Sequence, residues 1–248
     1  MTRTGTFFGI GVGPGEPGLI PVAAWNTLKK CQVIFVPRAS TMKHSVARRC
    51  LPTDEIPQHH FREVEFSLEA DRNVLSAHYA ELAEIIATEL CAGQDVAYLT
   101  LGDPLTYSTY IYTLAALQDR LPDLRHRTFP GVTSYCAVAA AAGFPLGEGK
   151  QHILILPCPA RMEELRSMIE THDTVVLMKI GDRLPLVLDL LREMGIAHHC
   201  VFGSRVGMAD EVLYANVAEM DPGKTRGYLS TLLIRKNAIE KPCPGAER

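Results

Sequence analysis

The chain contains 248 residues, of which 47% are hydrophobic and 21% charged, a balance that suits one or two globular domains with a sizeable core. Its 25 Lys and Arg against 28 Asp and Glu leave a formal net charge of −3, which argues against general binding to nucleic acid or a membrane surface. The longest apolar run, over residues 135–146, is shorter than the roughly 18 residues of a membrane span. The apolar stretch near the N-terminus is too short for a signal peptide, so we expect a cytoplasmic protein.

In the first half of the chain, short β-type runs alternate with stretches of helical periodicity. We expect strands over residues 6–11, 32–36 and 95–101, and helices over residues 19–30, 70–92 and 106–121. Alternation of this kind favours parallel βαβ units and therefore an α/β fold.

The second half of the chain alternates less regularly. We expect strands over residues 125–129, 152–156, 174–178, 199–203 and 228–235, and helices over residues 134–142 and 183–194. An Asp-Arg-Leu-Pro-Asp segment interrupts the periodicity near residues 119–124 and indicates a domain boundary there. The sequence thus predicts one domain over residues 1–119 and a second over residues 124–248.

The seven cysteines are scattered, and no two of them form a C-x-x-C pair. Two adjacent pairs, His59-His60 and His198-His199, come nearest to a ligand cluster, but neighbouring side chains diverge on a strand or a helix. We therefore expect no metal site, and we expect reduced thiols that pack as small hydrophobic side chains.

A glycine-rich loop, Gly9-Ile-Gly-Val-Gly-Pro-Gly15, follows the first expected strand. Its spacing departs from the dinucleotide-binding pattern G-x-G-x-x-G, because Pro14 occupies the sixth position counted from Gly9. Proline also lacks the backbone N–H that a phosphate cradle would use. The loop is therefore either a place where backbone approaches a ligand closely or a tight strand-to-helix turn. It is not a pyrophosphate-binding loop.

Two further turns, Leu99–Thr109 and Phe129–Ser134, also follow expected strands. Both combine Gly and Pro with hydroxyl side chains, and ligands of parallel sheets collect outside the carboxyl ends of strands. Asp103 in the first turn is either a ligand contact or an anion at a helix N-terminus. Thr133 and Ser134 in the second are either ligand contacts or helix caps.

The segment between Glu16 and Asp54 contains no acidic residue, although it carries several Lys and Arg. Arg38 and Lys43 stand in the loop that follows the second expected strand. A local excess of positive charge favours an anionic ligand, whereas a solvated helix face explains the other basic residues of the segment equally well. We therefore expect Arg38 and Lys43 to bind the substrate.

In combination, these segments resemble the tetrapyrrole (corrin/porphyrin) methylase family over about residues 5–236. The resemblance rests on Gly11-Val-Gly-Pro-Gly15, Gly102-Asp-Pro104 and Pro130-Gly-Val-Thr-Ser134, which occur in the order and at the spacing found in that family. Within the family, the stretch Thr100–Tyr112 resembles the branch that methylates C20 of precorrin-2 or of its cobalt form.

The resemblance implies two α/β domains with S-adenosylmethionine in the cleft between them, a tetrapyrrole substrate and a homodimer. It also implies which residues contact the cofactor: Pro14, Leu101, Gly102, Asp103, Thr106, Thr133, Ser134, Met178, Lys179, Ser230 and Thr231. Many of these contacts come from backbone atoms in the family, so the Lys179 side chain carries little information.

The implied reaction is substitution at a sulfonium methyl by an electron-rich carbon of the macrocycle, in which alignment of carbon, methyl and sulfur supplies much of the acceleration. Tyr107, Tyr110 and His44 are candidates for accepting the C20 proton, and the sequence selects none of them. The alternative within enzymes is another tetrapyrrole methylase, acting on uroporphyrinogen or a later precorrin, or a diphthine synthase, which modifies a histidine of a translation factor. A non-catalytic ligand-binding or sensor module is the alternative from a different class.

Overall fold

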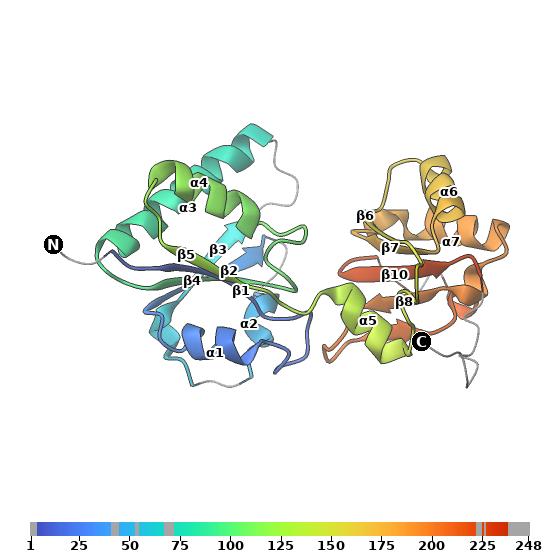
Figure 1. Cartoon of the computed structure of the whole chain (residues 1–248), viewed down its shortest axis with the longest axis horizontal. Helices are drawn as coiled ribbons and strands as arrows, with labels where there is room; N and C mark the ends of the chain where they lie inside the picture. The colour runs from blue at the N-terminus through green and yellow to red at the C-terminus, as the bar shows by residue number, and fades with distance from the viewer. Residues whose placement is uncertain are drawn as a thin grey trace. The chain divides into compact units, whose positions relative to one another are not determined.

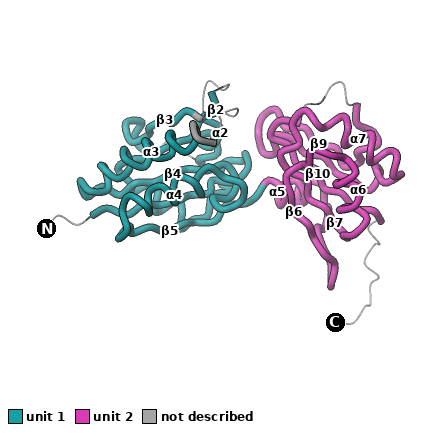
Figure 2. The backbone as a smooth tube through the Cα atoms, turned by 90° about the horizontal axis from the view of Figure 1, so that it is seen from above, with its two compact units in different colours: residues 1–133 teal, residues 134–248 magenta. Residues whose placement is uncertain are grey.

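The computed structural model of the protein describes residues 4–40, 45–52, 55–66, 72–221, 225 and 227–237. The chain forms two compact units, residues 1–133 and residues 134–248, each built on its own sheet (Figure 2). This division confirms the expected α/β class with two α/β domains. No helix of the described residues is both long enough and apolar enough to cross a membrane.

The first unit contains a parallel sheet with the strand order β3-β2-β4-β1-β5 (Figure 1). Its strands are β1 (Phe7–Gly11), β2 (Val33–Ala39), β3 (Phe61–Phe66), β4 (Val96–Thr100) and β5 (His126–Phe129). Because each described strand pair in this sheet is parallel, the strands all end at the same edge. The loops after β1, β4 and β5, which carry the Gly/Pro motifs, therefore begin side by side.

Helices cover both faces of the first sheet (Figure 1). They are α1 (Val22–Leu28), α2 (Val46–Arg49), α3 (Arg72–Cys91) and α4 (Tyr110–Arg120). On one face α3 and α4 pack against the strands, and Tyr79, Leu82, Ile86 and Leu90 of α3 are buried, as their helical spacing predicts. On the other face α1 and α2 cover the alternate strand residues.

The second unit contains a mixed sheet with the strand order β6-β7-β10-β8-β9. Its strands are β6 (Ile153–Pro157), β7 (Thr174–Met178), β8 (Val201–Ser204), β9 (Val212–Tyr214) and β10 (Ser230–Arg235). Strand β10 runs antiparallel to both of its neighbours, β7 and β8. Helix α5 (Ser134–Ala142) covers one face of the sheet, and α6 (Met162–Thr171) and α7 (Leu184–Glu193) cover the other (Figure 1).

The boundary between the units differs from the one that the sequence predicted. Strand β5 pairs in parallel with β1, with Phe7 opposite His126 and Ile10 opposite Phe129. The first unit therefore runs through Thr133, instead of ending near residues 119–124. The Pro-containing interruption over those residues is the turn that leads from α4 into the last strand of the first sheet.

The edge of the first sheet formed by β2 and β3 also differs from expectation. Strand β2 continues through Arg38, which the sequence placed in a loop, and Arg38 lies opposite Glu65 of β3. The sequence analysis did not predict β3 (FREVEF), whose three charged residues reduce its resemblance to a buried strand. These charges are paired on the sheet surface: Arg62 with Glu89 at 2.7 Å, and Arg38 with Glu63 at 3.2 Å.

Candidate functional site

Three glycines bring the loops after β1, β4 and β5 into backbone contact at the carboxyl edge of the first sheet. A Cβ atom placed on Gly131 would lie 2.1 Å from the carbonyl oxygen of Gly102, and one on Gly11 would lie 2.6 Å from the same oxygen. A side chain at either position would force the loops apart. The glycines of the three motifs therefore allow the loops to meet, as well as to turn.

The first two of these loops are also joined by hydrogen bonds. The Gly102 amide donates to the Gly13 carbonyl at 2.8 Å, and the Val12 amide donates to the Thr100 carbonyl at 3.0 Å. Gly13 has a φ of 84°, a conformation that glycine adopts without steric cost. Buried Pro14 and the Gly102 backbone, both expected to contact the cofactor, are thus held on neighbouring loops.

The space in front of Gly102 is open. A Cβ atom on this residue would meet only the Val132 carbonyl oxygen, at 3.9 Å. Gly102 has a φ of 73°, so it also needs the conformational freedom of glycine. A glycine with this much room at its Cβ position, between joined loops, is compatible with a ligand held through backbone contacts.

Asp103 links two of the loops through both of its carboxylate oxygens. Its Oδ2 accepts a hydrogen bond from the Gly131 amide at 3.0 Å, across 28 residues of sequence. Its Oδ1 accepts from the Leu105 amide at 2.9 Å and from the Thr106 hydroxyl at 3.2 Å. The side chains of Asp103 and Thr106 therefore stabilise the loop, and the backbone is left to face a ligand.

The three candidate proton acceptors have different surroundings. Tyr110 is fully buried, and its hydroxyl lies 2.7 Å from the Thr128 hydroxyl, so the side chain belongs to the core. Burial raises the pKa of Tyr110. His44 lies outside the described residues. Tyr107 is 41% exposed at the carboxyl edge of the first sheet and is the candidate whose position suits contact with a substrate.

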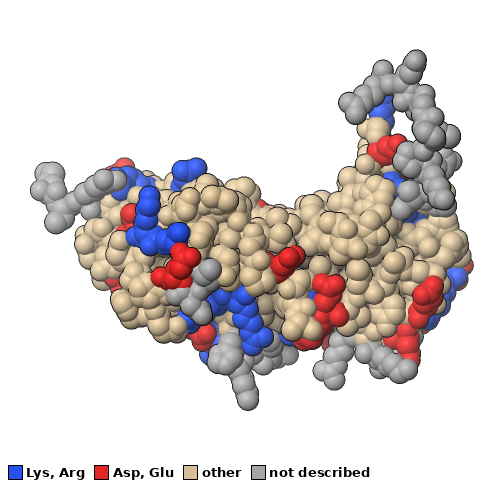
Figure 3. All heavy atoms as spheres, turned by 90° about the horizontal axis from the view of Figure 1, so that it is seen from below, with Lys and Arg blue, Asp and Glu red and all other residues tan. Residues whose placement is uncertain are grey.

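Arg38 has two acidic neighbours on β3. Besides its ion pair with Glu63, its guanidinium lies 2.5 Å from a carboxylate oxygen of Glu65. These carboxylates would compete with an anionic ligand for the same guanidinium. Lys43, the other expected substrate contact, lies outside the described residues. On the face shown in Figure 3, basic and acidic side chains are interspersed, without a broad field of one sign.

In the second unit, the expected cofactor contacts collect at one edge of the sheet. The Ser134 hydroxyl, at the start of α5, lies 2.9 Å from the Thr231 hydroxyl. Thr231 in turn pairs with Met178 in the β10–β7 register, and Lys179 follows Met178 directly. Ser230 is buried and its hydroxyl donates to the Gly227 carbonyl at 2.6 Å. Thr133, the last residue of the first unit, directly precedes Ser134.

Three non-glycine residues at this same edge have left-handed backbone conformations, which the sequence did not indicate. They are Lys179 after β7, Arg205 after β8 and Leu229 before β10, with φ values of 51°, 54° and 50°. Such conformations concentrate at functional sites, because they cost free energy that the surrounding structure must offset. Arg205 also forms an ion pair with Asp210 at 2.9 Å, and its amide donates to the Leu229 carbonyl.

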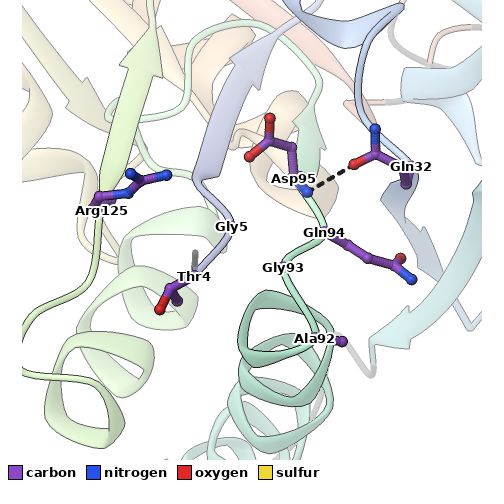
Figure 4. Close-up of a pocket in the computed structure, with 8 residues that line it drawn as sticks. All are labelled: Thr4, Gly5, Gln32, Ala92, Gly93, Gln94, Asp95 and Arg125. Atoms are coloured by element: carbon purple, nitrogen blue, oxygen red, sulfur yellow. Dashed lines mark hydrogen bonds between the residues drawn. The ribbon is translucent and has the colours of Figure 1, made fainter. Parts of the chain in front are cut away.

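A cavity of about 370 Å³ lies at the opposite edge of the first sheet, where the strands begin (Figure 4). Several of its polar lining groups already bind one another or a strand: the Asp95 amide donates to the Gln32 side chain at 2.8 Å, and Asp95 Oδ1 accepts from the Thr6 amide at 2.8 Å. Arg125 donates to the Thr6 hydroxyl at 3.0 Å. These groups stabilise the strand starts, and the loops that carry the motifs lie at the other edge. Among the described residues, no three His, Cys, Asp or Glu side chains form a group that could hold a metal ion.

Solved structures share the fold of this chain. A cobalt precorrin-4 methyltransferase superposes with a TM-score of 0.72 at 18% identity, covering 93% of this chain and 94% of the other. A uroporphyrin-III C-methyltransferase from Thermus thermophilus, solved with S-adenosylhomocysteine, superposes with a TM-score of 0.64 at 20% identity, covering 93% and 97%.

Sequence relatives align over nearly the whole chain. The cobalt-precorrin-2 C(20)-methyltransferase of Salmonella typhimurium is 29% identical over 232 residues, covering 94% of this chain and 97% of the relative. The precorrin-2 C(20)-methyltransferase of a Sinorhizobium species is 29% identical over 237 residues, covering 93% and 95%. A family model for the Tetrapyrrole (Corrin/Porphyrin) Methylases matches residues 6–221. The chain therefore belongs to the tetrapyrrole (corrin/porphyrin) methylase family.

Proposed function

We propose that the protein transfers a methyl group from S-adenosylmethionine to C20 of precorrin-2 or cobalt-precorrin-2, in corrin-ring biosynthesis. The observation that carries the proposal is the alignment with relatives of these two names over more than nine-tenths of both chains. A third relative, a probable cobalt-precorrin-2 C(20)-methyltransferase of Methanocaldococcus jannaschii, is 28% identical in an alignment that covers 92% of this chain and 95% of the relative.

The family resemblance assigns the cofactor contacts to residues that lie at one edge of each sheet. The first unit would contribute Pro14, the backbone of residues 101–103, Thr106 and Thr133, and the second unit Ser134, Met178, Lys179, Ser230 and Thr231. The room at Gly102 supports this assignment, because a Cβ atom there would meet only the Val132 carbonyl oxygen, at 3.9 Å. When bound, S-adenosylmethionine supplies a methyl group already activated by a sulfonium centre.

The part of this chain in the reaction is orientation. A sulfonium methyl needs no Lewis acid, since its leaving group is a neutral thioether, and a well-aligned pair of reactants reacts with a large effective molarity. Backbone held rigid by the Asp103 hydrogen bonds serves that purpose. We therefore propose that catalysis needs no metal bound by the protein, and that methyl transfer to the metal-free ring persists after dialysis against EDTA.

The experiment that tests the proposed function is incubation with isotopically labelled S-adenosylmethionine and precorrin-2 under anaerobic conditions, followed by mass spectrometry. One labelled methyl group at C20 supports the proposal. A methyl at another position of the ring, label on a translation factor added as the substrate of a diphthine synthase, or bound cofactor without transfer would each contradict it. We further propose a homodimer, as the family resemblance implies, which sedimentation equilibrium measures directly.

A further inference from the structure

Tyr107 has an unusual backbone conformation on the loop between β4 and α4. Its φ is 55°, and in the described part of the first unit it is the one non-glycine residue with a positive φ. The left-handed region disfavours residues with a Cβ, and for a bulky aromatic residue it is a genuine outlier. A residue kept in this conformation needs neighbours that enforce it.

Hydrogen bonds fix the chain on both sides of Tyr107. On its N-terminal side, Asp103 accepts from the Leu105 amide and the Thr106 hydroxyl. On its C-terminal side, the Thr109 hydroxyl lies 3.0 Å from the hydroxyl of Tyr98, a fully buried residue of β4. The loop is therefore held at both ends, and the strained conformation at Tyr107 is the consequence.

The segment of sequence that contains Tyr107 carries no charged residue. Residues 104–118 contain no Asp, Glu, Lys, Arg or His. Leu105, two residues before Tyr107, is 60% exposed, and Tyr107 itself is 41% exposed. Both directly follow the Gly102-Asp103 segment that we assign to the cofactor. An exposed aromatic ring two residues from an exposed leucine can pack against the face of a macrocyclic ligand, whose carboxylate side chains lie at its rim.

We propose that Tyr107 is a substrate-contacting residue, whose ring packs against the tetrapyrrole macrocycle and which the strained loop holds in place for that purpose. The inference rests on the proposed function, because it takes the tetrapyrrole as the substrate. The proposed contact is made by the ring, and the Phe variant below tests whether the hydroxyl takes part. The strained backbone lowers the stability of the folded enzyme, and it is retained because it fixes the position of the ring.

The test uses three variants of Tyr107 in the full-length protein and one matched control. Tyr107→Gly and Tyr107→Asn remove the ring and introduce residues that tolerate the left-handed conformation. Glycine also makes the loop more flexible, and the asparagine variant serves as the control for that effect. Tyr107→Phe keeps the ring without its hydroxyl. The control, Tyr112→Ala, removes another exposed aromatic ring, from helix α4.

We expect the Gly and Asn variants to raise the melting temperature by about 2–4 °C, because they relieve the backbone strain at one residue. We expect the same variants to raise the KM for precorrin-2 by about tenfold or more, and to leave the dissociation constant of S-adenosylhomocysteine within about twofold. Tyr107→Phe, which keeps the ring, should raise the KM for precorrin-2 much less than the Gly and Asn variants do, and Tyr112→Ala should retain the wild-type KM and kcat.

Several results would overturn the inference. Gly and Asn variants with the wild-type KM for precorrin-2 would show that the ring does not contact the substrate. A Phe variant that loses kcat by about a hundredfold at unchanged KM would assign the work to the hydroxyl. If the wild-type protein neither binds nor methylates precorrin-2, the proposed function itself is wrong, and this control separates the two failures.

Discussion

Replacing Gly102 with alanine tests whether the cofactor lies against this backbone. An alanine at a φ of 73° costs about 1–2 kcal/mol of folding free energy, the usual penalty for an L residue in the left-handed region. The added Cβ meets no atom of the protein closer than 3.9 Å, so no internal clash is added to that cost. If the cofactor occupies the open space, the same methyl group collides with it. We then expect the dissociation constant to rise by about tenfold or more, or about 1.4 kcal/mol.

Gly195 provides a matched control for the backbone cost. It follows α7 in the second unit, its φ is 71°, and a Cβ there would have nothing within 4 Å. Gly195→Ala should therefore lose the same folding free energy as Gly102→Ala and keep the wild-type affinity. Titration calorimetry with S-adenosylhomocysteine measures the affinity, and denaturant unfolding measures the stability of each variant.

The outcome that refutes the reasoning is clear. If Gly102→Ala loses stability as Gly195→Ala does but binds S-adenosylhomocysteine within about twofold of the wild-type affinity, the space in front of Gly102 does not hold the cofactor. Equal losses of affinity in both variants would instead show that strain, and not contact, controls binding.

Three further predictions concern side chains. Asp103→Asn replaces one acceptor oxygen by a donor and leaves an amide such as that of Gly131 unpaired. The free energy of unfolding should therefore fall by about 1–3 kcal/mol, and the affinity for the cofactor should fall with it. Unchanged thermal stability would contradict the loop-linking role. Converting Arg38 and Lys43 to Gln should weaken tetrapyrrole binding, more at low salt than at high salt, and spare S-adenosylhomocysteine binding; parallel loss of both ligands would point to misfolding. Burial raises the pKa of the Cys31, Cys50 and Cys200 thiols to about 12. These thiols should therefore stay protonated and should not react with Ellman's reagent at pH 8 in the folded protein. Rapid labelling of any of the three would contradict their packing in the core.

The elements that the sequence predicts best are those whose own composition marks them. Helix α5 and strand β7 begin and end at the residues expected for them, Ser134–Ala142 and Thr174–Met178. The first is a run of small apolar residues and the second is a strand buried along most of its length, so each has a local signal that does not depend on distant partners. The motif loops were predictable for the same reason, because Gly and Pro mark turns wherever they occur.

Features that depend on distant partners were not predictable. Strand β3 carries three charged residues among its six, and these form ion pairs with Arg38 and Glu89, which lie on other elements. Positive φ at Arg205 and Leu229 has no signal in residue type, since neither is Gly, Asn or Asp. The linking role of Asp103 depends on Gly131, which sequence alone does not place within hydrogen-bond distance.

The pairing of β5 with β1 decides where the first unit can be cut. A fragment ending at residue 119, as the sequence boundary suggests, would lack β5 and leave β1 as a sheet edge. That edge would expose the backbone of Phe7–Gly11, an apolar strand without a charged residue, which is the kind of open strand that recruits other chains and aggregates. A fragment ending at Thr133 keeps the strand covered, and it also retains the Gly131 amide that holds Asp103. The fourteen residues between the two fragment ends, 119 and 133, therefore decide whether β1 is covered by β5 or is an open edge that aggregates.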